Sequence, residues 1–207
     1  MKPRYLSALA LAVAPTSAAA HSFESGADLY AQFVEGAGVV VTYPAVFLPL
    51  LALGLFLSLW HAEGMVRAWP VFLLGQLAGI AVAPLVGEWI LPLMMGTGLI
   101  VGALAALLPH PGRIAALFFA GLLGILALAL GLEGHALFEL PVLIHLGLIF
   151  GTNATVALAA GIARLAMDRV PADWMRITLR VAASWIAAML MLILAFTVRT
   201  GPGGGGL

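Results

Sequence analysis

The sequence has no cysteine, which excludes disulfide bonds, thiolate metal sites and cysteine nucleophiles. Charged residues are scarce as well: they make up 9% of the 207 residues, whereas a soluble domain carries roughly 25%. So few charges cannot cover a water-facing surface, and most of the exterior is therefore expected to face lipid. The nine basic and nine acidic residues cancel. With no basic patch to neutralise phosphates, we expect no nucleic-acid partner.

What the chain does have is apolar sequence, with 63% hydrophobic residues and a mean hydropathy of +1.13. It also has 24 glycines and 12 prolines, which would damage soluble helices but are tolerated in membrane helices, where small residues let backbones approach closely. The sequence therefore predicts an all-α integral membrane bundle.

The N-terminus has the three parts of a secretory signal peptide. Lys2 and Arg4 form a charged region, an apolar stretch of about ten residues follows, and Ala18-Ala19-Ala20 gives a small-residue cleavage site. The apolar stretch is too short to cross about 30 Å of hydrocarbon. We expect residues 1–20 to be removed, so that His21 begins the mature chain. The alternative is an uncleaved first anchor.

Residues 21–38 are polar and are expected outside the bilayer or along its surface, and residues 39–200 are expected to form six transmembrane helices. Each apolar stretch has close to the 20 or so residues that a crossing requires. The expected spans are Val39–Trp60, Trp69–Val86, Trp89–Leu108, Ile114–Gly131, Leu140–Ala163 and Ile177–Val198. Trp60, Trp69 and Trp89 stand at span ends, as interfacial anchors do. The glycine-rich residues 201–207 are expected to be disordered.

The distribution of arginine gives an orientation. If the signal is cleaved, one side of the membrane holds six arginines and the other holds only Arg199; the six are Arg67, Arg113, Arg164, Arg169, Arg176 and Arg180. Positive residues are retained on the cytoplasmic side. We therefore expect a multi-pass protein of the bacterial inner (cytoplasmic) membrane, with both mature termini outside.

Polar residues within spans are costly in hydrocarbon and are for that reason informative. His145 is the only histidine inside an expected span, and Asn153 lies eight residues further on, on roughly the same helical face. One interpretation is a ligand or proton carrier that lines a path through the bundle. The other is a neutral histidine that bonds to a neighbouring helix.

A second group of candidates lies on the expected outer side. It consists of His21, Glu88, Glu133, His135 and Glu139, with Glu24 and Asp28 nearby in the N-terminal segment. Imidazole and carboxylate together suit a divalent first-row cation such as nickel, cobalt or zinc. The alternative is that these loops carry acids only because basic residues are kept inside.

Several segments resemble one membrane-protein family. They are Trp69-Pro70 through Leu108, Ala115-Ala116-Leu117-Phe118 through Gly134-His135, Glu139-Leu140-Pro141, and Phe150-Gly151-Thr152-Asn153-Ala154-Thr155 followed by Ala159-Ala160-Gly161-Ile162. Together with the signal and six short spans, they are similar to the HupE/UreJ family of hydrogenase- and urease-accessory membrane proteins. That resemblance implies a permease for nickel or cobalt, with metalloenzyme accessory proteins as partners.

The metal-binding positions are where this sequence departs from the family. The family's first span carries a histidine–proline pair and an aspartate–histidine pair. The matching stretch here, Val39 to Leu55, has no histidine and no aspartate, and Tyr43-Pro44 is the nearest counterpart. The fourth-span exit keeps one histidine, His135, where the family has two. The sequence thus resembles the family more closely in its helices than at the metal-binding positions.

Two functions follow from the sequence. The first is an inner-membrane permease or accessory protein for a divalent transition-metal ion, using His21, Glu88, Glu133, His135, Glu139, His145 and Asn153. The second is a non-transporting membrane subunit that binds and stabilises a partner complex. An enzyme is not expected, because the sequence has no G-x-S-x-G, P-loop or H-E-x-x-H motif.

Overall fold

The structure is a computed structural model that describes residues 28–108, 110–136, 139–170 and 173–200. The expected signal peptide, His21, Glu24 and the glycine-rich tail lie outside the described residues. Within the described part every regular element is helical. The elements are α2 (Leu29–Thr42), α3 (Pro44–Trp60), α4 (Gly64–Val82), the short 3-10 helix η1 (Ala83–Leu85), α5 (Ile90–Leu107), α6 (Arg113–Gly131), α7 (Val142–Arg169) and α8 (Asp173–Thr200).

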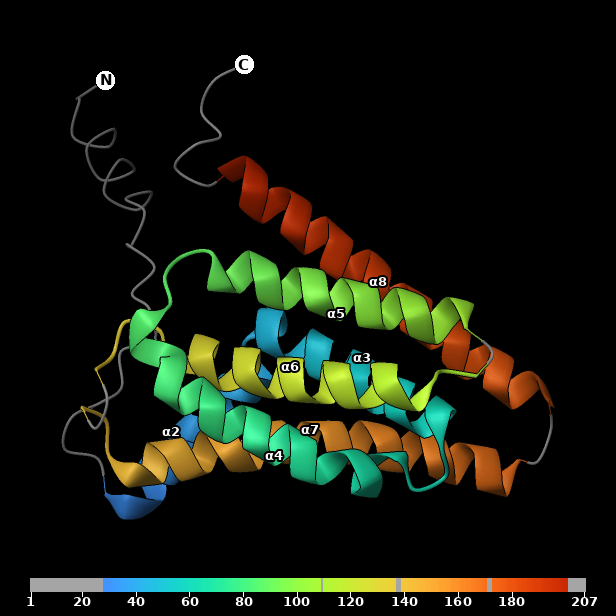
Figure 1. The fold of residues 1–207 in the computed structure, drawn as a ribbon, viewed down its shortest axis with the longest axis horizontal. Helices are drawn as coiled ribbons and strands as arrows, with labels where there is room; N and C mark the ends of the chain where they lie inside the picture. Colours follow the sequence, from blue (N-terminus) through green and yellow to red (C-terminus); the bar gives the residue numbers. More distant parts are fainter. Residues whose placement is uncertain (1–27, 109, 137–138, 171–172, 201–207) are drawn as a thin grey trace, which may run out of the picture.

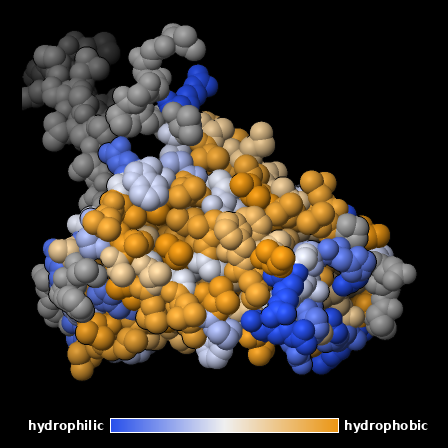
Figure 2. All heavy atoms as spheres, viewed as in Figure 1, coloured by the Kyte–Doolittle hydropathy of each residue, from blue (hydrophilic) through white to orange (hydrophobic). Residues whose placement is uncertain are grey.

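Five helices in the described part, α4 to α8, are long and apolar enough to cross a membrane; the bent pair α2 and α3 would make a sixth span. α5 and α6 begin and end within one residue of the expected spans. α7 continues six residues beyond its expected end at Ala163, and α8 begins four residues before Ile177. In Figure 2 apolar residues cover the middle of the face shown, while hydrophilic residues gather towards its ends.

The expected first span, Val39–Trp60, is not one straight helix. It is split at Tyr43, and α2 and α3 meet there at 75°. Proline disfavours helical dihedrals in the residue before it, and Tyr43 accordingly has extended dihedrals (φ −100°, ψ 100°). Pro44, which has no N–H to leave unsatisfied, then begins α3. Pro44 therefore sets the start of the apolar helix α3, five residues later than the expected start of the span at Val39.

α3 lies at the centre of the bundle, and twelve of its 17 residues are buried. It packs against α5, α7, α8 and α6, while α4 packs mainly on α6 and α2 mainly on α7. Figure 1 shows α4, α5, α6 and α7 running side by side, with α8 slanting across the outside of α5. The apolar helix α3 is therefore covered by its neighbours, as expected for a helix in the core of a membrane bundle.

The order of the helices gathers six arginines at one end of the bundle and three loop glutamates at the other. The acidic end holds Glu88, Glu133 and Glu139 in the loops before α5 and before α7. The basic end holds six arginines in the first or last two turns of α4, α6, α7 and α8: Arg67, Arg113, Arg164, Arg169, Arg176 and Arg180. This separation matches the arginine distribution from which the orientation was predicted.

Candidate functional site

The loop that follows α6 brings Glu133 and His135 to the acidic end. Gly134 between them has φ +82°, a left-handed conformation that side chains rarely adopt. The turn is held by backbone bonds from Glu133 N to Leu130 O (3.3 Å) and from His135 N to Leu132 O (3.2 Å). The Nδ1 atom of His135 lies 3.2 Å from Glu133 O. The glycine therefore folds both candidate ligands back over the end of α6.

Glu133 lies close to a second carboxylate. Partial burial raises the pKa of Glu133, and the negative charge of Glu88, in the loop before α5, raises it further. The Tyr43 hydroxyl, at the break between α2 and α3, is near enough to Glu133 for the charge of that carboxylate to act on it. Two carboxyl groups that oppose each other's ionisation would be stabilised by a cation placed near both.

His145 stands in the first turn of α7, at the same end. Its Nδ1 lies 3.1 Å from the carbonyl oxygen of Pro141. Because a carbonyl can only accept, Nδ1 must carry the proton, and in the neutral ring Nε2 then has the lone pair. The bond is to the start of its own helix. This nitrogen therefore does not make the bond to a neighbouring helix that one of the two interpretations of His145 requires.

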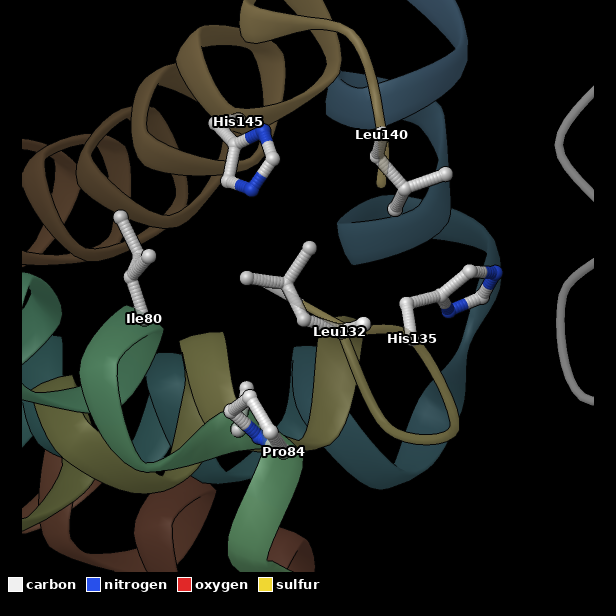
Figure 3. A pocket seen from close by; sticks show the side chains of 8 residues that line it. Ile80, Pro84, Leu132, His135, Leu140 and His145 are labelled. Atoms are coloured by element: carbon white, nitrogen blue, oxygen red, sulfur yellow. The ribbon is translucent and has the colours of Figure 1, made fainter. Parts of the chain in front are cut away.

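The two histidines line one small cavity of about 10 Å³, which we call the acidic-end cavity. Its other walls come from α4, η1, the end of α6 and the loop before α7; they are Ile80, Ala83, Pro84, Leu132, Ala136 and Leu140. In Figure 3 Nε2 of His145 faces the space between Ile80 and Leu132, while the ring of His135 turns away and Leu132 lies between the two rings. The space is about that of one water molecule.

The remaining candidates are not gathered around this cavity. Glu139 is exposed, and its Oε2 accepts a hydrogen bond from Ala136 N (2.7 Å). Asp28 accepts from Ala31 N (2.7 Å) and so caps α2. Among the described residues no group of three or more histidine and acidic side chains is placed to hold a metal ion. The structure thus places Glu88 near enough to Glu133 for their charges to interact, and it places His135 and His145 on the wall of one cavity with Leu132 between their rings.

Asn153 belongs to a different set of contacts, two turns deeper in the bundle. Gln76 of α4 donates from Nε2 to Thr152 Oγ1 (2.6 Å), and its Oε1 accepts from Asn153 Nδ2 (2.9 Å). Asn153 Oδ1 accepts from the indole N–H of Trp69 (2.8 Å). Gln76 and Thr152 are fully buried. These four residues form a polar bridge between α4 and α7, and no buried side-chain polar atom in the described part lacks a partner.

The sequence singled out Asn153 as a polar residue within a span but could not assign its partners. Trp69 was predicted to be an interfacial anchor, yet its indole N–H takes part in the bridge. The available signal was that α4 and α7 each carry an amide side chain in otherwise apolar sequence. An amide buried in hydrocarbon requires partners, and another amide can satisfy both its donor and its acceptor.

A larger cavity of about 190 Å³ lies at the basic end, between the start of α4 and the second half of α7. We call it the basic-end cavity; it is lined by Ser58, Ala62, Glu63, Gly64, Met65, Val66, Ala157, Ala160, Gly161 and Arg164. Glu63 forms an ion pair with Arg67 (3.3 Å), and Arg164 forms one with Asp168 (2.6 Å). The charges at its rim therefore cancel in pairs.

Both cavities and the polar bridge lie along the same two antiparallel helices. From the acidic end, the residues met on α7 are His145, then Thr152 and Asn153, then Ala157 at the basic-end cavity. His145 precedes Thr152 by two turns, about 10 Å, and Asn153 precedes Ala157 by about one turn, or 6 Å. We call this line of contact the α4–α7 seam. It is closed in its middle by the buried bridge.

Comparisons with known proteins identify no relative of this chain. No family model, no curated protein and no solved structure matches the chain. The resemblance to the HupE/UreJ family therefore depends only on the sequence segments that suggested it.

Proposed function

We propose that this chain is a six-span protein of the bacterial inner membrane, made with a cleaved signal peptide and with both mature ends outside. The five apolar helices and the bent α2–α3 pair support six crossings. The gathering of arginines at one end supports placing that end in the cytoplasm. The acidic end then faces outward.

In that membrane the protein passes a divalent transition-metal ion, of the nickel or cobalt type, along the α4–α7 seam. The α4–α7 seam is the observation that carries this proposal: it joins a histidine-lined cavity at one end to a larger cavity at the other through a line of polar side chains. Polar residues within transmembrane segments are rare. They face the interior of the bundle and mark the pathways of ions and other substrates. The resemblance to the HupE/UreJ family supports the identity of the cargo.

Each group on the route has a role in this proposal. Glu88 and Glu133 attract the cation to the outer mouth, where it relieves their mutual repulsion. Nε2 of His145 supplies the first imidazole ligand, because the Pro141 carbonyl holds the proton on Nδ1. The oxygens of Gln76, Thr152 and Asn153 offer the next contacts once their mutual bonds open. The membrane potential drives the positive charge inward without an ATP-binding motif.

Uptake by the purified full-length chain in proteoliposomes tests this proposal. Vesicles with the wild-type chain are expected to accumulate Ni²⁺ or Co²⁺ when the interior is made negative. His145→Ala is expected to reduce uptake to the level of empty vesicles, and Glu133→Ala to reduce it in part. His110→Ala is the matched control, because His110 lies in the exposed loop at the other end, outside α4 and α7.

Uptake that is unchanged in His145→Ala would remove the route. Absence of uptake by the wild-type chain, together with co-purification of a stoichiometric partner protein, would instead favour the non-transporting subunit. Metal analysis of the same purified samples separates the two functions further, since the permease is expected to retain ions that the His145→Ala variant does not.

A further inference from the structure

A second charged feature lies at the basic end, away from the α4–α7 seam. It consists of Arg176 and Arg180 in the first two turns of α8 and of Arg113 at the start of α6, three residues after His110 in the chain. We call these three arginines the basic corner. The exposed His110, in the loop between α5 and α6, lies beside Arg176, with its Nε2 at 3.5 Å from Arg176 Nη1.

Arg180 fixes the geometry of the basic corner. Its Nε donates to Ala106 O (2.8 Å) and its Nη2 donates to Leu107 O (3.0 Å). These carbonyl groups belong to the last turn of α5, where they have no partner within the helix. Arg180 thereby ties the start of α8 to the end of α5 and holds the loop that carries His110 against α8.

Arg113 and Arg176 are exposed, and no described carboxylate forms an ion pair with either. In the described part the ion pairs at this end are Glu63 with Arg67 and Arg164 with Asp168. Those two arginines are neutralised within their own helices. The guanidinium groups of Arg113 and Arg176 are accessible at the surface of this end.

Apolar side chains surround these charges. Ile114 is 86% exposed, Leu107 72% and Ile177 58%. They lie on α6, α5 and α8 respectively, within one turn of a basic residue or its carbonyl partner. A surface with guanidinium groups at its rim and exposed aliphatic side chains beside them is complementary to a molecule with an anionic head and apolar tails.

We infer that the basic corner binds the headgroup of an anionic phospholipid. The phosphate accepts hydrogen bonds from Arg113 and Arg176, and the acyl chains lie along Ile114 and Ile177. Guanidinium groups bind phosphate with paired, charge-assisted hydrogen bonds. Basic clusters between transmembrane helices at the cytoplasmic side recognise anionic lipids in this way. The bound lipid fastens α8, the least buried of the five long apolar helices in the described part, to the α5–α6 loop.

The experiment measures the thermal unfolding of the full-length chain in lipid nanodiscs. Discs of phosphatidylcholine alone are compared with discs that also contain phosphatidylglycerol. The anionic lipid is expected to raise the unfolding temperature of the wild-type chain. Arg113→Gln and Arg176→Gln are expected to lose that rise, while Arg113→Lys and Arg176→Lys, which keep the charge, retain part of it.

Arg199→Gln is the matched control, because Arg199 is an exposed arginine at the other end of α8. It removes the same charge and is expected to keep the whole lipid-induced rise. Soluble glycerol phosphate added to phosphatidylcholine discs is expected to have no effect, which separates a lipid site from a phosphate site. An equal rise in every variant would show diffuse attraction and overturn the inference. So would a wild-type chain that does not respond to phosphatidylglycerol.

Discussion

At the scale of the residue, Glu133 is a loop carboxyl group whose ionisation the fold opposes. Burial raises its pKa above the ordinary value of 4.5, and the charge of Glu88 adds to the effect. A raised pKa in the folded state means that ionising Glu133 costs more in the folded chain than in the unfolded one. The favourable contribution of protonated Glu133 to the free energy of unfolding is complete below about pH 4.5. It is lost as the pH rises through the raised pKa of the folded chain.

Glu133→Gln is therefore expected to raise the thermal unfolding temperature at pH 7, because the amide is never charged. The difference from the wild-type chain should shrink as the pH is lowered and disappear below the ordinary carboxyl pKa. Glu88→Gln should give a smaller rise in the unfolding temperature with the same pH dependence, because it removes only the repulsion from the charge of Glu88 and leaves Glu133 partly buried. The measurement is a pH series of unfolding temperatures in detergent; a Glu133→Gln chain less stable than wild type at pH 7 would contradict the assignment.

Single residues were also where sequence reasoning was least complete. His145 could be recognised because it is an imidazole in an apolar helix. The proton on its Nδ1 could not be, because that depends on the Pro141 carbonyl, which the start of α7 places beside it. Asn153 was expected to share a route with His145, and its actual partners, Gln76 and Trp69, lie some eighty residues away in the sequence.

At the scale of the element, α2 is held on α7 by glycines. A Cβ at Gly147 would collide with the backbone oxygen of Phe33, and one at Gly36 would collide with that of Ile144. The rings of Phe33 and Phe150 pack beside this crossing, with centroids 5.4 Å apart. Close backbone approach of this kind is how helices associate in membranes, where lipid is as apolar as the helix surface.

Gly147→Ala is expected to push α2 off α7 and to destabilise the chain by about 1–3 kcal/mol, the usual cost of overpacking. Gly161→Ala is the control on the same helix, because a Cβ there has no atom within 4 Å. Thermal unfolding and limited proteolysis within residues 29–43 report the two effects. Equal behaviour of the two variants would mean that the crossing does not hold α2.

Hydropathy alone predicted the elements that are purely apolar. α5 and α6 are continuous apolar runs with clear breaks on each side, and their limits were expected to within one residue. The break at Tyr43 was missed because the hydropathy averaged over a whole span stays high across it. The signal was Pro44, whose effect on the preceding residue is steric and invisible to a hydropathy average.

At the scale of the whole molecule, the all-helical architecture and the separation of acidic and basic ends could be predicted, because both follow from local composition. The pairing of helices could not. α4 packs on α6, and α2 on α7, through small residues that many helices of this sequence share. The α4–α7 seam emerges only from that packing, since no segment of the chain contains both of its walls.

The central claim is that an ion crosses along the α4–α7 seam, and filling the basic-end cavity tests it most directly. Gly161 lines that cavity and has open space at the position of a Cβ, so Gly161→Leu should fold normally and block the exit. The control is Gly96→Leu on α5, where the Cβ position is equally open. In proteoliposomes, Ni²⁺ uptake is expected to fall to the level of empty vesicles in Gly161→Leu and to persist in Gly96→Leu. Full uptake by a folded Gly161→Leu chain would contradict the account.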